Sequence, residues 1–253
     1  MKRSYDLCRN WSFIPHGDDS ALQPGFDDSK SERVTVPHTN IRLPWHSFDD
    51  RAYEFVSIYR RHFRAPAGWR EKRVFADFDG AMTAATVAIN GHAFPEYQGG
   101  YTPFSRELTD HLRQDADNVL AVKLDSTERA DIPPFGGNID YLTFGGIYRD
   151  VRLRVVPKTF IANVFARPIR VLDAEPGLSV RCWLDGPVAN GAKLAVELRD
   201  GDRILSTNSA PVVGSDGAFH VVAIERAGKV QLWDLEHPKL YQVLVKLSNP
   251  DGT

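Results

Sequence analysis

The chain has 253 residues and a formal net charge of −2 at pH 7, with 42% hydrophobic, 25% charged and 11% aromatic residues. This composition is that of folded globular protein, and it excludes a disordered chain and a broad surface field suited to nucleic acid or anionic lipid. At about 150 residues per domain, the length predicts two domains.

The cysteine content and the first residues bear on the environment of the chain. Cys8 and Cys182 lie far apart and lack the spacing of metal ligands, so we expect neither a disulfide framework nor a zinc site. Residues 1–7 lack the apolar region of a signal peptide, and no run of 18 apolar residues occurs. We therefore expect a cytoplasmic chain without a membrane partner.

Strand patterns dominate residues 1–157. Apolar residues recur at every second position in the runs 74–78 and 119–124. In the second run, the predicted buried face consists of Leu120, Val122 and Leu124. Asn90-Gly91 predicts a tight hairpin, because both residue types tolerate positive φ. A last strand runs to Pro157, where we place the end of the first domain.

Residues 158–253 show a second series of short strands. Alternating apolar residues occur at 178–184, 194–198, 219–223 and 241–247, and this spacing predicts an immunoglobulin-like sandwich. The turn sequence at 248–252 follows the last strand, and no return strand comes after it. We therefore expect the natural protein to continue, with the second domain truncated at its C-terminal end.

Several segments resemble, in family order, the opening domains of one enzyme family. The most specific is Gly-Gly-Ile-Tyr-Arg-Asp-Val at 145–151. The others are 26–28 with 34–38, 58–63, 87–91, 99–104, 118–122, and 232–233 with 237–241. Together they resemble the sugar-binding domain and the following domain of glycoside hydrolase family 2, in particular its β-galactosidases.

The resemblance implies an all-β chain without the catalytic part. The expected fold is a jelly-roll, galactose-binding-like β-sandwich at 1–157, followed by an immunoglobulin-like β-sandwich at 158–253; a (β/α)8 barrel would come next. Family members resemble one another in being retaining enzymes, whose two carboxyl groups lie about 5 to 5.5 Å apart and belong to the barrel. We therefore assign no catalytic residue and no cofactor to this chain, although a cation in the parent's sugar pocket stays open.

The resemblance also points to four residues for substrate binding. Asp140 occupies a loop position near the pocket of related β-galactosidases, where its carboxylate suits sugar hydroxyls or a cation. Asp49 and Asp50 are the polar candidates of a second loop. Trp45 suits stacking against a sugar face. The structural alternatives are a turn-capping role for the carboxylates and a packing role for the tryptophan beside Pro44.

Three functional hypotheses follow from these observations. The first is the non-catalytic front part of a β-galactosidase, bracing the barrel and bordering its pocket, with terminal β-galactosides as partners of the whole enzyme; β-glucuronidase and mannosidase are alternative parent activities. The second is a free-standing carbohydrate-binding module. The third is a structural domain pair for assembly, so homo-oligomerisation stays open. We expect no nucleic-acid partner.

Overall fold

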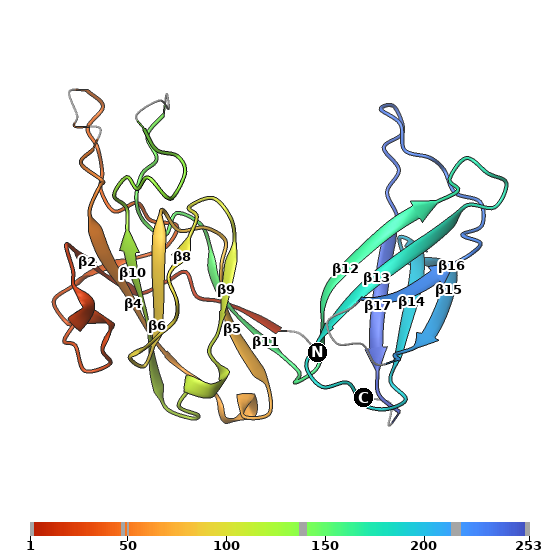
Figure 1. The fold of residues 1–253 in the computed structure, drawn as a ribbon, viewed down its shortest axis with the longest axis horizontal. Coiled ribbons are helices and arrows are strands. Elements are labelled where there is room, and N and C mark those ends of the chain that lie inside the picture. The colour runs from red at the N-terminus through yellow and green to blue at the C-terminus, as the bar shows by residue number, and fades with distance from the viewer. Residues whose placement is uncertain (1–2, 47–48, 50, 137–140, 214–218, 251–253) are drawn as a thin grey trace. The chain divides into compact units, whose positions relative to one another are not determined.

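The computed structural model describes residues 3–46, 49, 51–136, 141–213 and 219–250 (Figure 1). The chain folds as two compact units, Met1–Pro157 (unit 1) and Lys158–Thr253 (unit 2). Strands make up most of the regular structure of both units, so the all-β prediction is confirmed. Within the described ranges, no helix is long and apolar enough to cross a membrane.

Unit 1 is built from short antiparallel strands and three 3-10 turns. The strands are β1 (Arg3–Asp6), β2 (Trp11–Pro15), β3 (Glu32–Val34), β4 (Val56–Arg64), β5 (Arg73–Phe78), β6 (Ala84–Ile89), β7 (His92–Ala93), β8 (Tyr97–Gln98), β9 (Phe104–Glu107), β10 (Asp117–Asp125) and β11 (Val151–Val156). The 3-10 turns are η1 (Asp19–Leu22), η2 (Ala67–Trp69) and η3 (Thr109–His111).

These strands form two sheets that enclose one core. One sheet has the order β1-β11-β5-β9, and the other has the order β3-β2-β4-β10-β6-β7, with β8 paired to β6 (Figure 1). Alternate side chains of both sheets point inward, as the two-residue period of a strand requires. The largest of the fully buried apolar side chains in this core are Trp11, Tyr59 and Phe78.

Strand β10 is buried more completely than its sequence pattern predicts. Leu120, Val122 and Leu124 face the core, as expected, but Ala121 on the opposite face is also fully buried. The segment that contains η1 covers that face, because Ala21 and Leu22 pack against Ala121 in a small second cluster. A central strand covered on both sides loses its polar alternation.

The hairpin at Asn90-Gly91 is confirmed. Ile89 of β6 pairs with His92 of β7, and the two intervening residues have φ values of 52° and 87°. The Asn90 side chain is held on both ends: its Oδ1 accepts from the Val119 amide at 3.0 Å, and its Nδ2 donates to the His111 carbonyl and to Asn118 Oδ1, both at 2.8 Å. The turn is thereby fastened to β10 and η3.

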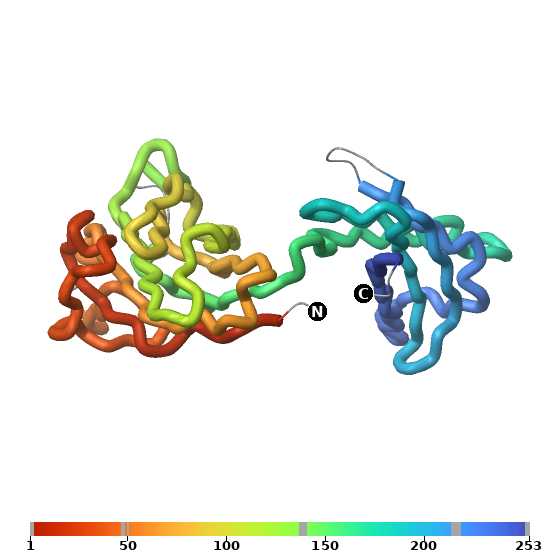
Figure 2. The backbone as a smooth tube through the Cα atoms, turned by 90° about the horizontal axis from the view of Figure 1, so that it is seen from below, coloured from red at the N-terminus to blue at the C-terminus, as the bar shows by residue number. Residues whose placement is uncertain are grey.

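Unit 2 is a smaller sandwich with its own core. Its strands are β12 (Phe160–Ile169), β13 (Gly177–Asp185), β14 (Lys193–Asp200), β15 (Arg203–Pro211), β16 (His220–Ile224) and β17 (Gln242–Ser248). They form two three-stranded sheets, β12-β13-β16 and β15-β14-β17, and Figure 2 follows the backbone from β12 in green to β17 in blue. Val180, Cys182, Leu194 and Val196 are central to the core.

Strand β16 forms where alternation predicts a strand, and the residues between the alternating set are the buried ones. The sequence pattern emphasises Phe219, Val221 and Ala223, whereas the buried side chains are Val222 and Ile224. Phe219 and Val221 point outward, and the Phe219 ring lies 5.4 Å from that of Trp183. Both faces of this strand carry apolar residues, so alternation alone does not decide which one packs inward.

Candidate functional site

Two long loops leave the sandwich of unit 1 at the same end (Figure 1). We define the loop end as the described residues of 38–55, 99–103 and 126–148. The loops run side by side at their base, because the His38 amide donates to the Ile147 carbonyl at 2.8 Å and the Asn40 amide to the Gly145 carbonyl at 3.0 Å. Backbone hydrogen bonds to the sandwich therefore fix where the loop end begins.

The base of the loop end requires the glycines of the 145–151 motif. A Cβ on Gly145 would lie 2.3 Å from Ser126 Oγ, and one on Gly146 would lie 2.4 Å from the His38 carbonyl oxygen. Gly146 also has a φ of +117°, which residues with side chains rarely adopt. The motif that carries most of the family resemblance thus has a packing function.

Tyr53 joins the two loops above this base. Its hydroxyl accepts from the Thr143 hydroxyl at 3.1 Å, and its ring lies 5.8 Å from that of Phe144. Its backbone carbonyl accepts from Asn40 Nδ2 at 2.7 Å. Asn40 is buried, and its Oδ1 has no hydrogen-bond partner among the residues described, so this acceptor is available to a water molecule.

Exposed aromatic side chains surround the loop end. Trp45 is 94% exposed, and Tyr101 and Tyr141 are about half exposed. Burial, together with a hydrogen bond to Tyr141, raises the pKa of Tyr101 above its usual value. Tyr148 donates to the Gly100 carbonyl, and Arg149 Nη1 donates to the Tyr101 carbonyl at 3.1 Å. Aromatic faces beside phenolic hydroxyls are suited to binding sugars.

The four predicted site residues have different outcomes. Trp45 lies at the loop end and does not pack in the core, so its stacking role stays a prediction. Asp49 is exposed, and its carboxylate accepts from the Arg51 amide at 2.9 Å, a contact typical of a turn. Asp50 and Asp140 lie outside the described residues, and their roles also stay predictions.

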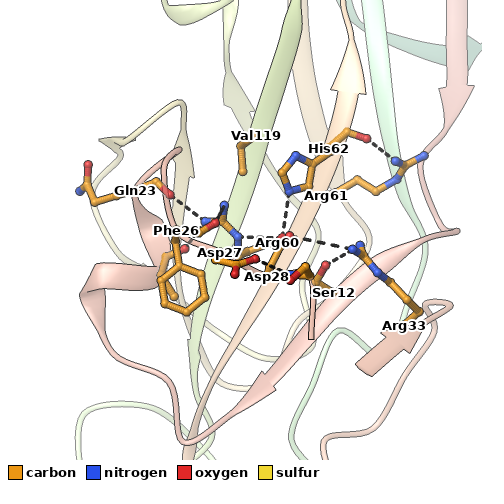
Figure 3. Close-up of polar contacts among 12 residues, drawn as sticks. Ser12, Gln23, Phe26, Asp27, Asp28, Arg33, Arg60, Arg61, His62 and Val119 are labelled. Carbon is orange, nitrogen blue, oxygen red and sulfur yellow. Dashed lines mark hydrogen bonds and ion pairs between the residues drawn. The ribbon is translucent and has the colours of Figure 1, made fainter. Parts of the chain in front are cut away.

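A second polar cluster lies on the outer face of β4 (Figure 3). The fully buried Arg60 donates through Nε to Asp28 Oδ2 at 3.0 Å and through Nη1 to the Gln23 carbonyl at 2.9 Å. His62 Nε2 contacts the same Asp28 oxygen at 2.8 Å, and Arg33 Nη2 lies 3.9 Å from Oδ1. The cluster fastens the segment before β3 onto β4.

The charge state of Asp28 follows from this arrangement. Burial alone would raise the pKa of its carboxyl, but hydrogen bonds from His62 and Arg60 outweigh burial and hold the pKa below its usual value. Asp28 and Arg60 belong to two separate sequence motifs, and no local pattern connects them. Their spacing of 32 residues is the reason, because only the fold brings them together.

Metal-ligating side chains and thiols are scattered among the described residues. Among them, no group of three or more His, Cys, Asp or Glu side chains is arranged to hold an ion. Cys8 and Cys182 are both free thiols. Burial raises the pKa of Cys8 to about 11 and also raises that of Cys182, so neither is poised as a thiolate at neutral pH.

Known proteins similar to this chain share one family. The family model described as "Glycosyl hydrolases family 2, sugar binding domain" matches residues 10–157. A β-galactosidase of Thermoanaerobacter pseudethanolicus is 33% identical over 94% of this chain and 32% of its own length. A β-glucuronidase of Bacteroides fragilis is 30% identical over 88% of this chain and 33% of its own length.

Solved structures agree with the sequence relatives. The crystal structure of a Bacteroides uniformis β-glucuronidase superposes with a TM-score of 0.83 at 30% identity, and the match covers 99% of this chain and 31% of that protein. The chain therefore spans about a third of the length of the relatives that it matches.

Proposed function

This chain belongs to glycosyl hydrolase family 2, and on that premise we propose that its protein hydrolyses terminal β-galactosides, with the loop end of unit 1 bordering the sugar pocket. Relatives named as β-galactosidases range from 24% to 34% identity and those named as β-glucuronidases from 24% to 30%, so the identities above 30% are all to β-galactosidases. This difference favours galactosides, and the solved β-glucuronidases make glucuronides the second candidate.

The observation that carries the proposed role is the construction of the loop end. Its base is fixed by backbone hydrogen bonds and by two glycines, while Trp45, Tyr101 and Tyr141 are exposed around it. A rigid base beneath exposed aromatic groups positions side chains against a ligand without a large ordering cost. We assign the acid/base and nucleophilic carboxyls to a barrel outside this chain, so the chain alone is expected to be inactive.

Hydrolysis by the natural protein tests the activity. We expect turnover of nitrophenyl β-galactoside and little turnover of nitrophenyl β-glucuronide; turnover of the glucuronide alone would select the second candidate. Turnover by the present chain alone would overturn the assignment of catalysis to a barrel.

The role of the loop end is tested by Trp45→Ala. The variant is expected to raise KM for the galactoside about fivefold with little change in kcat, because a stacking contact supports ground state and transition state alike. Trp233→Ala is the matched control, since Trp233 is 55% exposed in unit 2. Equal KM and kcat values in both variants would show that Trp45 does not contact the substrate.

A free-standing carbohydrate-binding module is the alternative from another class, and the family model's description as a sugar-binding domain supports it. Titration of the present chain with galactose separates the two hypotheses when the perturbed residues are mapped. Saturable perturbation of Tyr101 and Tyr141 would favour a complete site at the loop end. No effect there would favour a pocket that another domain completes.

A further inference from the structure

The outer face of the β1-β11-β5-β9 sheet carries a polar depression. Its volume is about 510 Å³, and its polar lining consists of Ser4, Asp77, Asp79, Ser105, Arg152 and Arg154. These polar residues belong to the four strands of the sheet or, for Asp79, directly follow one of them. The lining also includes Pro103, which is the one residue that it shares with the loop end. The inward neighbours on the same strands fill the core, so the face has a rigid support.

Strand register brings the polar side chains together. Asp77 of β5 lies opposite Arg152 of β11 on one side and opposite Ser105 of β9 on the other. Arg154 reaches Asp77 diagonally, with Nε 2.7 Å from Oδ2 and Nη2 3.0 Å from Oδ1. Ser105 Oγ donates to Asp77 Oδ1 at 2.6 Å. Asp77 is therefore held in one orientation by two neighbouring strands.

Beside Asp77, the ion pair of Arg152 and Asp79 leaves some hydrogen-bonding groups without a partner among the described residues. Arg152 donates through Nη2 to both carboxylate oxygens of Asp79, and within the described part of the chain its Nε and Nη1 groups have no acceptor. The Ser4 hydroxyl likewise has no partner among those residues. The side chains of Arg152 and Asp79 are 41% and 34% exposed, so these donors and acceptors are accessible from solvent.

The charge balance indicates the class of ligand. Two arginines and two aspartates give the depression no net charge, so it has no electrostatic preference for an anion or a cation. A ligand that fits must donate to carboxylates and accept from guanidinium groups at neighbouring atoms. Adjacent hydroxyls of a sugar ring do both. The volume also lies within the usual range of about 300 to 1,000 Å³ for small-molecule sites.

We propose that this depression is a second saccharide site, which binds a neutral sugar unit with adjacent hydroxyls on the sheet face of unit 1. Phe78 and Phe104, which also line it, are buried, and on the outer face Arg154 covers the neighbouring Phe75 ring at 4.4 Å. We therefore expect hydrogen bonds rather than aromatic stacking to hold the ligand, and the binding to be weak. The inference does not depend on the hydrolytic activity proposed above.

Nuclear magnetic resonance titration of the ¹⁵N-labelled chain with methyl β-galactoside and methyl β-glucoside tests the proposal, with inorganic phosphate as the charged comparison. We expect saturable shifts at Ser105 and Arg152 for at least one glycoside and none for phosphate. Arg152→Gln is expected to weaken that binding about tenfold or more, since hydrogen bonds to charged groups are lost.

Arg64→Gln is the matched control, because Arg64 also pairs with a carboxylate in unit 1 but lies outside both the depression and the loop end. If Arg152→Gln does not fold, Ser4→Ala and Ser105→Ala take its place. Shifts confined to Tyr101 and Tyr141, equal binding of phosphate, or unchanged affinity in the folded variants would each overturn the second site. None of these outcomes bears on whether the natural protein hydrolyses galactosides.

Discussion

At the scale of single residues, one carboxylate decides how the segment before β3 is held. Asp28 is shared by the buried Arg60, by His62 and by Arg33. The other hydrogen bonds of Arg60 go to uncharged backbone carbonyls of this segment. Asp28 is therefore the one counter-charge at hydrogen-bond distance from its guanidinium in the described structure. Loss of the Asp28 charge leaves a buried cation without compensation.

Asp28→Asn is therefore expected to lower the free energy of unfolding of unit 1 by about 3 kcal/mol. Asp115→Asn is the matched control, because Asp115 pairs with Arg64 where both side chains are more than 60% exposed. Such surface pairs contribute about 0 to 1 kcal/mol. Urea unfolding followed by tryptophan fluorescence measures both variants, and similar losses would show that the buried cluster contributes no more than a surface pair.

The same carboxylate predicts a dependence on pH. Hydrogen bonds hold the pKa of folded Asp28 below its usual value of 3.8, so its stabilising contribution is present above that value. The contribution is lost as the pH falls through the lower, folded pKa. The stability difference between the wild type and Asp28→Asn is therefore expected to be present in full at pH 5 and to shrink below about pH 4. A difference that is still undiminished at pH 2 would contradict this.

At the scale of elements, the segment 145–146, in which Gly146 forms a β-bridge with Met82, joins the sandwich to the loop end. Gly146→Ala is expected to destabilise unit 1 by more than about 3 kcal/mol, because the new Cβ meets the His38 carbonyl and the residue must keep its positive φ. Gly25→Ala is the control, since nothing lies within 4 Å of its Cβ position. Thermal unfolding measures the midpoints of both variants, and equal midpoints would show that position 146 tolerates a side chain.

The elements also show where sequence patterns suffice. The alternation in β5 and β13 and the Asn-Gly turn predict local structure that the fold confirms, because these signals depend on neighbouring residues. The burial of Ala121 on the outer face of β10 depends on a segment far away in the chain, and so does the choice of which face of β16 packs inward. The contact between Tyr101 and Tyr141 likewise joins residues 40 positions apart, so the cluster at the loop end could not be predicted.

At the scale of the whole molecule, each unit has a separate buried core. Leu194→Ala removes a side chain that is 1% exposed in unit 2, and it is expected to cost about 3 kcal/mol there without changing the transition of unit 1. Leu235→Ala, at a residue that is 88% exposed, is the control. Differential scanning calorimetry separates the outcomes; a single transition that shifts as one would show coupled unfolding.

The fastened turn at Asn90-Gly91 has a consequence for the chemical ageing of the protein. Asn-Gly sequences deamidate when the glycine nitrogen attacks the asparagine side chain to form a succinimide, which requires that side chain to rotate. Three hydrogen bonds prevent this at Asn90, whereas the Asn190 side chain has none among the described residues. After prolonged incubation at pH 8, peptide mapping should therefore find deamidation at Asn190 well before Asn90; the reverse order would show that the hydrogen bonds give no protection.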